Sequence, residues 1–228
     1  KDFQVSLNGN KLLRFLRKTP VKTVTLWGFS SDNWKRDKKE ISGLMRIFGF
    51  LVDRYFDELM EGNSRFIHLG RKDRIPKSLL KKFTEAEEKS KRNTGQIVGL
   101  AIDFSGEDQN IRILKKAKGL PNGNVDEETL WGLRDSGGII RSADLIFRTS
   151  EARTSDVGWI NGKHTVLYFL PNKFFQNKKR PRPTRGMIRQ IAEHRLEMML
   201  SFERAEQNML LIGDWYTAKL YEVIHEEL

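Results

Sequence analysis

Hydrophobic and polar positions follow two different periods along the chain, and their alternation predicts strands separated by helices. Short β-branched or aromatic runs bounded by Gly, Asn, Asp or Pro are typical of strands that are buried on both faces. Apolar positions at helical spacing lie between these runs, most clearly from Ile41 to Leu59 and from Pro76 to Phe83. This order predicts an α/β fold in which helices flank a parallel central sheet. The predicted strands are residues 23–29, 65–69, 97–102, 144–148 and 165–170.

The pattern changes after Leu170, and the change divides the chain into two parts. Residues 178–185 (KKRPRPTR) are basic and punctuated by proline, which is typical of a hinge. Residues 187–228 then follow a mostly helical pattern that is interrupted at Gly213-Asp214. We therefore expect a main domain over residues 1–172 and, over residues 173–228, a basic hinge with a helical C-terminal extension.

Charge narrows the classes of partner. The 228 residues include 41 Lys and Arg against 30 Asp and Glu, a net charge of +11, which favours nucleic acid, anionic lipid or phosphorylated small molecules. The sequence contains no cysteine, so disulfides, thiol nucleophiles and cysteine-ligated metals are excluded, and a cytoplasmic location fits. It has no P-loop, dinucleotide-binding motif or H-E-x-x-H pair, and no apolar run of membrane-spanning length.

Two polar segments follow predicted strands, at the sheet edge where ligands bind in open α/β folds. Residues 30–36 (SSDNWKR) combine hydroxyls, a carboxamide, an indole and two cations. They form either an anion pocket or a polar loop whose Ser and Asn cap the next helix. Residues 148–155 (RTSEARTS) hold two arginines with hydroxyls between them, which can grip a diphosphate, or which form ion pairs on a surface loop.

Three segments in order resemble the cis-prenyltransferase family, which includes undecaprenyl diphosphate synthase. Residues 24–48 (VTLWGFSSDNWKRDKKEISGLMRIF) resemble its F-S-x-E-N-W-x-R loop and the long helix that follows. Residues 74–95 (RIPKSLLKKFTEAEEKSKRNTG) are similar to its next helix and N-x-T-G turn. Residues 144–155 (DLIFRTSEARTS) resemble D-L-x-I-R-T-[SG]-G-E-x-R-x-S. The resemblance covers about residues 1–172 and implies the cis-prenyltransferase fold.

The resemblance also implies an activity and residue roles. The enzyme would use an allylic prenyl diphosphate and condense it with isopentenyl diphosphate, or with a divergent prenyl acceptor. Its long helix from Ile41 would line a hydrophobic tunnel for the growing chain, and its assembly would be a homodimer. Catalytic roles fall to Ser30, Asn33 and Trp34, and substrate-binding roles to Arg36, Arg148, Glu151, Arg153 and Ser155.

The chain departs from the family at its metal-binding positions. The family opens with a strand and D-G-N-x-R-W-A, whose Asp binds magnesium, and this motif has no counterpart before Lys1. Val166 stands where the family has a magnesium-binding Glu, and the glycine expected between Ser150 and Glu151 is absent. The resemblance implies Mg²⁺, while the metal ligands of this chain are unknown.

Three explanations fit these departures. An N-terminal segment could lie outside this sequence, or the protein could be a divergent member with a different acceptor or metal site. The missing strand could instead come from the far end, where residues 209–214 (MLLIGD) are an apolar run that ends in Asp214.

Two other functions compete with prenyl transfer. The net charge, Trp27 and Trp34 would suit a nucleic-acid-binding protein, but the basic residues are spread along helices and no known nucleic-acid-binding motif is present, so we expect no nucleic acid. A catalytically silent subunit of a heteromeric prenyltransferase is the other alternative, and the intact loop 30–36 argues against it. The basic stretch 178–185 could also dock on an anionic membrane.

Overall fold

The computed structural model describes residues 14, 16–120, 124–150, 152–171 and 208–212. Within these ranges six strands form one sheet in the order β2-β3-β1-β6-β4-β5, and every neighbouring pair is parallel. The parallel α/β fold predicted from the sequence is therefore confirmed. The strands are β1 (Thr23–Ser30), β2 (Arg65–Leu69), β3 (Ile97–Phe104), β4 (Ala143–Ser150), β5 (Asn161–Pro171) and β6 (Asn208–Ile212).

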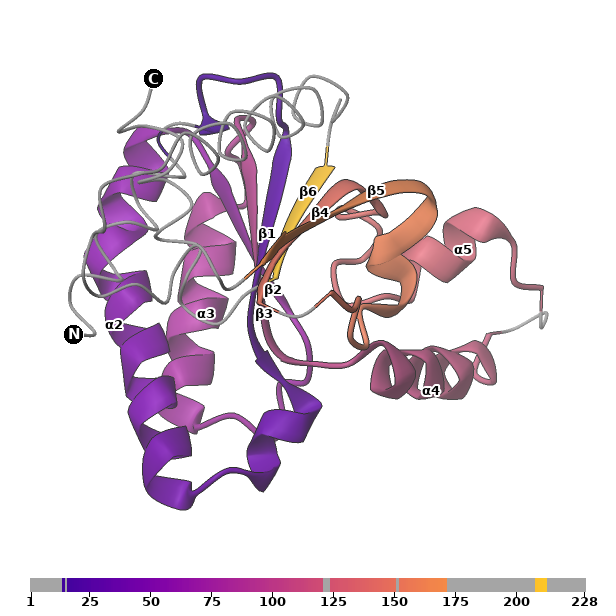
Figure 1. The fold of residues 1–228 in the computed structure, drawn as a ribbon, viewed down its shortest axis with the longest axis horizontal. Helices are drawn as coiled ribbons and strands as arrows, with labels where there is room; N and C mark the ends of the chain where they lie inside the picture. The colour runs from indigo at the N-terminus through magenta and orange to yellow at the C-terminus, as the bar shows by residue number, and fades with distance from the viewer. Residues whose placement is uncertain (1–13, 15, 121–123, 151, 172–207, 213–228) are drawn as a thin grey trace, which may run out of the picture.

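Helices cover both faces of this sheet. As Figure 1 shows, α2 and α3 lie on one face, and α4 and α5 lie on the other. No helix within the described ranges is long and apolar enough to cross a membrane. The helices are α2 (Lys38–Glu61), α3 (Lys77–Ser90), α4 (Gly106–Ala117) and α5 (Glu127–Gly132), with 3-10 turns η1 (Ser31–Lys35) and η2 (Gly158–Ile160).

Strand β3 contributes side chains to two separate cores, one on each face of the sheet. Val98 and Ile102 pack in the cluster that includes residues of α2 and α3, whereas Ala101 packs in the cluster that faces the other way. Strict alternation would place Phe104 with Ile102, but Phe104 joins the cluster of Ala101. The cause is Asp103, whose φ of 55° lies in the left-handed region and turns the end of the strand.

The long helix α2 agrees with the helical pattern predicted from Ile41 to Leu59. Asp37 begins it, because its Oδ1 accepts a hydrogen bond from the Lys39 amide at 2.8 Å. Its buried residues Met45, Phe48 and Leu59 belong to a closed cluster with α3 and the strands. These three positions therefore contribute to the packed core, and Met45 also lines a groove between α2 and α3.

Strand β6 corrects the prediction of a mostly helical C-terminal extension at residues 208–212. Residues 208–212 form a strand between β1 and β4, with Leu210 in register with Thr25 and Ile146. Met209 and Leu210 are 1% and 0% exposed. A short apolar run that is buried on both faces cannot be told from a buried helical segment by its periodicity, which is why the pattern misled.

The arrangement also bears on the missing family strand. Of the three explanations, a strand supplied from the far end is the one that β6 supports, because this C-terminal run takes a central place in the sheet. The rest of the proposed extension and the basic stretch 178–185 lie outside the described residues.

His68 on β2 is a histidine buried in the core. Its Nε2 lies 3.0 Å from the Ile102 carbonyl oxygen, and its ring lies 4.7 Å from the ring of Phe83. Burial lowers the pKa of His68 below its ordinary value of 6.5, although the Ile102 carbonyl and the charge of Glu87 oppose the shift. The imidazole is therefore neutral at pH 7.

We expect this histidine to make stability depend on pH. Below pH 6.5 the unfolded chain takes up a proton that the folded chain excludes, so the free energy of unfolding falls with acidification, by up to about 1.4 kcal/mol per pH unit. Urea unfolding between about pH 7.5 and about pH 5.5 measures this dependence. His68→Gln should remove this slope, and the exposed-site control His164→Gln should keep it. An unchanged slope in His68→Gln contradicts the assignment.

Candidate functional site

The carboxyl ends of β1, β6 and β4 lie side by side at one edge of the sheet. Ile212, the last residue of β6, is in register with Trp27 of β1 and Arg148 of β4. The sheet extends in opposite directions from this point: β3 and β2 lie on the far side of β1, and β5 lies on the far side of β4. In parallel α/β folds ligands bind outside the strand ends at such a switch point, and we call this region the crevice. Both polar segments singled out in the sequence follow strands that border it.

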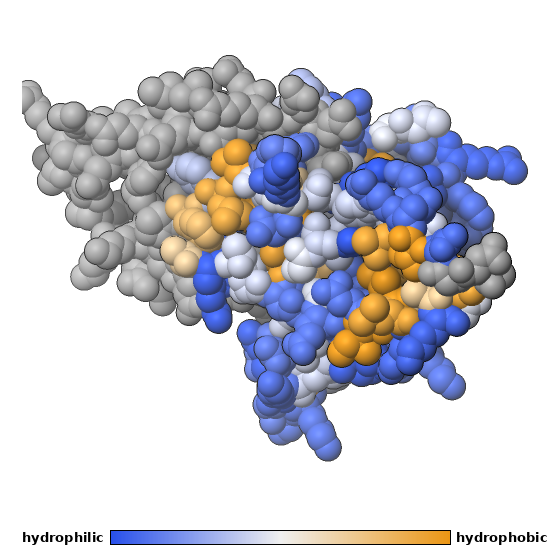
Figure 2. Space-filling model, turned by 90° about the vertical axis from the view of Figure 1, so that its right-hand side faces the viewer, coloured by the Kyte–Doolittle hydropathy of each residue, from blue (hydrophilic) through white to orange (hydrophobic). Residues whose placement is uncertain are grey.

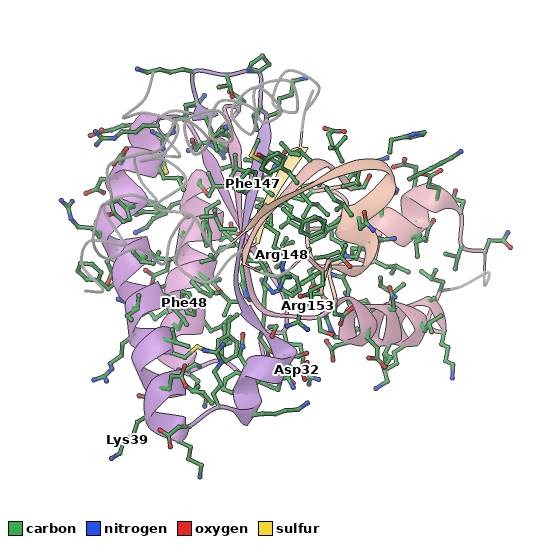
Figure 3. The ribbon with its side chains drawn as sticks, viewed as in Figure 1. Asp32, Lys39, Phe48, Phe147, Arg148 and Arg153 are labelled. Atoms are coloured by element: carbon green, nitrogen blue, oxygen red, sulfur yellow. The ribbon has the colours of Figure 1, made fainter. Side chains whose placement is uncertain are left out.

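Arg148 is the buried cation of this edge. Arg148 is only 8% exposed, and its Nη1 donates a hydrogen bond to the Ser155 hydroxyl at 2.5 Å. Ser155 has a φ of 55°, so the loop after β4 folds back toward the strand that it leaves. A guanidinium beside a hydroxyl offers directed donors for phosphate oxygens. Figure 3 shows Arg148 at the sheet and Arg153 farther out on the loop.

Asp156 ties the loop after β4 to the start of α4. Its carboxylate accepts hydrogen bonds from the Ser105 hydroxyl at 2.5 Å and from the Glu107 amide at 3.1 Å. Its carbonyl oxygen accepts one from the Gly106 amide at 3.0 Å. The two backbones are so close that a Cβ added to Gly106 would lie 2.5 Å from Gly158 Cα. The loop that carries Ser155 is therefore anchored on a helix.

We expect Asp156→Ala to weaken diphosphate binding more than it weakens the fold. The loss of the helix cap should lower the free energy of unfolding by about 1 kcal/mol. The affinity for inorganic diphosphate, measured by calorimetry, should fall about tenfold because Ser155 loses its anchor. Asp126→Ala is the matched control, since Asp126 caps α5 through the Thr129 amide at 2.8 Å. Equal affinities in the two variants would contradict a positioning role.

The loop after β1 forms the short turn η1. Asn33 Oδ1 accepts a hydrogen bond from the Ser30 amide at 2.7 Å, which closes the turn on itself. The Trp34 ring meets the Phe29 ring edge to face at 5.1 Å between centroids. Arg36 Nη1 donates to Glu40 Oε1 at 2.7 Å, across the first turn of α2. Asn33 and Arg36 thus make the contacts that the polar-loop interpretation predicts. The turn η1 directly follows β1, one of the strands that border the crevice.

The structure brings some of the predicted site residues together and leaves others apart. Arg148 and Ser155 meet directly, and Ser30, Asn33 and Trp34 share the segment that runs from the end of β1 into η1. Arg153 is exposed. Glu151 lies outside the described residues.

A buried ion pair at the end of β3 is a feature that sequence reasoning missed. The Asp103 side chain has no exposure, and Arg74 binds both of its oxygens, with Nε 2.8 Å from Oδ2. The Arg74 guanidinium also lies 5.9 Å from the centre of the Trp34 ring. Arg74 therefore links the end of β3 to η1. An acidic residue directly after an apolar strand was the signal available in the sequence.

The described residues do not fit a magnesium site. They contain no group of three or more His, Asp or Glu side chains that could hold a metal ion. The carboxylate of Asp103 is already paired with Arg74, and the side chain of Val166 has no oxygen. Asp214, which follows β6 by two positions, lies outside the described residues.

Comparisons with known proteins agree with this geometry. The family model described as undecaprenyl diphosphate synthase matches residues 6–181. The isoprenyl transferase of Aquifex pyrophilus is 34% identical over 159 residues, which cover 69% of this chain and 68% of that protein. The isoprenyl transferase of Streptococcus pneumoniae is 33% identical over 163 residues, which cover 67% of this chain and 64% of that protein. The chain thus spans about two thirds of the length of these relatives.

Solved structures resemble the whole described fold. A protein from Campylobacter jejuni described as a probable undecaprenyl diphosphate synthase superposes with a TM-score of 0.66 at 27% identity, over 86% of this chain and 90% of that one. Lavandulyl diphosphate synthase from Lavandula x intermedia, in complex with dimethylallyl diphosphate, superposes with a TM-score of 0.71 over 88% of this chain and 84% of that one. At 24% identity it supports the fold alone. Since the matched residues 6–181 include the loops after β1 and β4, the chain belongs to the undecaprenyl diphosphate synthase family of prenyl-group transferases.

Proposed function

We propose that the protein transfers prenyl groups from an allylic prenyl diphosphate to isopentenyl diphosphate, or to a divergent prenyl acceptor. The observation that carries this proposal is the buried Arg148, whose Nη1 donates to Ser155 at the crevice beside β6. A cation with little exposure retains most of its attraction for a dianionic phosphate, because little water screens it. Membership of the family favours this reaction over nucleic-acid binding.

The reaction needs stabilisation of a leaving diphosphate. The allylic C–O bond breaks, inorganic diphosphate leaves with the electron pair, and the acceptor double bond forms the new C–C bond. Loss of a proton from the acceptor restores a double bond, so the product is one isoprene unit longer. Guanidinium and hydroxyl donors that are already in place stabilise charge where it develops, which is the largest contribution that such a site can make. By the resemblance, Arg148, Arg153 and Ser155 would hold the diphosphate of isopentenyl diphosphate and so place the acceptor beside the ionising donor.

The remaining predicted residues take supporting roles in the proposal. Arg153 and Glu151 would join Arg148 and Ser155 in binding isopentenyl diphosphate from the loop after β4. Ser30, Asn33 and Trp34 would close over the substrates from η1. Arg36 would exchange its exposed partner Glu40 for a phosphate oxygen, a small cost because exposed ion pairs contribute only about 0–1 kcal/mol.

The proposal assigns magnesium to a carboxylate that follows β6. Asp214 is the second residue after Ile212 in the sequence, and Ile212 is in register with Arg148. Asp214→Asn should abolish magnesium-dependent activity while leaving the unfolding transition unchanged. If Asp214→Asn keeps full activity, the metal is held elsewhere or is not used.

Quaternary structure and location are further parts of the proposal. We propose a homodimer, since Val166 and Leu167 on the sheet-edge strand β5 are 38% and 37% exposed. Figure 2 shows that apolar side chains also gather on the side of α4 and α5, where Ile111 and Leu114 are exposed. The proposal also includes a cytoplasmic location and contact between the basic stretch 178–185 and an anionic membrane. Sedimentation velocity and vesicle flotation measure these properties.

One incubation tests the function. The purified protein is mixed with dimethylallyl, geranyl or farnesyl diphosphate and isopentenyl diphosphate, with magnesium or with EDTA, and the products are identified by mass spectrometry. A ladder of products spaced by one isoprene unit, lost in EDTA, supports chain elongation. If no product forms but diphosphate binding is tight and is lost in Arg148→Ala, the acceptor is a different molecule or the chain is a silent subunit.

A further inference from the structure

The connection between β2 and α3, residues 70–76, lies on the carboxyl end of β3. Gly70 has a φ of 122°, and a Cβ added there would lie 2.1 Å from the Ile102 carbonyl oxygen, so this close approach requires glycine. The Arg71 amide donates a hydrogen bond to the Asp103 carbonyl oxygen at 3.1 Å. The start of the connection is therefore fixed on the end of β3.

A closed circuit of polar contacts also ties this connection to α4 and to the loop after α5. The Gly70 amide donates to Asp135 Oδ2 at 2.9 Å, and Arg71 Nη1 donates to Asp108 Oδ1 at 3.1 Å. Arg112 on α4 closes the circuit, because its Nε donates to Asp108 at 2.7 Å and its Nη2 donates to Asp135 at 3.0 Å. Since Gly70 and Arg71 are neighbours in the chain, the backbone that leads into α3 is held at two consecutive residues.

Arg74, later in the same connection, neutralises the buried carboxylate of Asp103. Its Nε lies 2.8 Å from Oδ2, and its Nη2 binds Oδ1, so the planar guanidinium is held at two points. The Asp103 side chain has no exposure, and a carboxylate without exposure requires a charge partner. This two-point contact fixes both the position and the rotation of the guanidinium relative to β3.

The Arg74 guanidinium also contacts the Trp34 ring of η1, at 5.9 Å from the ring centre. The same ring packs against Phe29 of β1, at 5.1 Å between centroids. Trp34 Nε1 is buried and has no hydrogen-bond partner among the described residues, so no hydrogen bond within that part of the chain orients the indole. Packing and the attraction of Arg74 therefore hold its orientation.

We propose that Arg74 is a positioning residue for prenyl transfer, which orients Trp34 while Asp103 holds it to β3. The inference rests on the proposed function, in which Trp34 closes over the substrates from η1. Arg74 touches no substrate here, because its guanidinium is engaged by Asp103 and acts through the indole. Without this contact the ring would turn, and misplacement of a group that orients substrates lowers the rate of the chemical step more than it weakens binding.

Arg74→Lys tests the inference, because it keeps the charge beside Asp103 and loses the planar fork. We expect kcat for prenyl transfer to fall about tenfold, while KM for isopentenyl diphosphate and the affinity for inorganic diphosphate change by less than about twofold. Arg141→Lys is the matched control, since Arg141 donates to both oxygens of Glu128 and lies 5.5 Å from the centre of the Trp131 ring on α5. It should leave kcat unchanged.

Trp34 fluorescence gives a readout that a merely structural role would not move. The spectrum of each variant, minus that of the same variant carrying Trp34→Phe, isolates this indole among the five tryptophans of the chain. We expect stronger acrylamide quenching of Trp34 in Arg74→Lys and no change in Arg141→Lys. The double variant Arg74→Gln/Asp103→Asn leaves no buried charge unpaired, so it should fold and should show the same fall in kcat and the same quenching.

Three results would overturn the inference. If an active Arg74→Lys enzyme keeps the wild-type kcat and Trp34 quenching, Arg74 positions nothing and the proposed function stands. If Arg74→Lys loses affinity for inorganic diphosphate, Arg74 binds the substrate itself. If kcat falls equally in Arg141→Lys, the effect is a general loss of packing. A wild type that forms no product would instead contradict the proposed function and, with it, a role of Arg74 in this reaction, so wild-type activity distinguishes the two failures.

Discussion

Replacing Arg148 with alanine is expected to lower kcat/KM for prenyl transfer by about 10²-fold to 10³-fold. The side chain is almost fully buried and donates to Ser155, so no exposed cation can take its place when it is removed. The affinity for inorganic diphosphate should fall in parallel, because the same donors hold the ground state. Steady-state kinetics and calorimetry on one preparation measure both quantities.

Two further substitutions separate charge from geometry. Arg148→Lys keeps the charge but loses the planar fork, so we expect only partial recovery of affinity. Arg141→Ala is the matched control, because Arg141 precedes the opposite end of β4 and pairs with Glu128 on the surface. It should leave activity unchanged. An Arg148→Ala protein that melts like the wild type and still binds diphosphate would contradict the proposed site.

Sequence pattern located the strands better than the helices of the second face. Strand β1 lies within one residue of the predicted run 23–29, because β-branched and aromatic residues of this run mark a strand whichever face they occupy. Helix α4 was not predicted, and the reason is visible in its burial. Ile113 is buried, but Ile111 and Leu114 are 47% and 66% exposed, so its apolar positions do not mark a single core face.

The contacts of the candidate site are also of two kinds. Some join residues that are close in the sequence, and others join residues that are far apart in it. The contact of Arg148 with Ser155 joins residues seven positions apart, and a polar loop after a strand was enough to suggest it. Asp156 with Ser105, and Arg74 with Asp103, join residues 51 and 29 positions apart. Nothing in one sequence indicates which distant partner a polar side chain meets, since the fold alone brings these residues together.

Leu210→Ala is expected to lower the free energy of unfolding by about 2 to 5 kcal/mol. Its side chain is fully buried in the cluster that includes Ile146 and Ile67, and a cavity would replace it. Leu114→Ala is the control, because this side chain is 66% exposed and its loss should change stability by less than about 0.5 kcal/mol. Urea denaturation of both variants provides the comparison.

The consequence for function follows from the place of β6. Among the described strands, β6 alone joins β1 to β4, and thereby joins η1 to the loop that carries Ser155. Weakening β6 should therefore reduce diphosphate binding even at temperatures where the helices persist, whereas a peripheral C-terminal segment would leave binding intact. If Leu210→Ala unfolds at the same urea concentration as the wild type, residues 208–212 do not belong to the sheet, and the crevice must be completed by another strand.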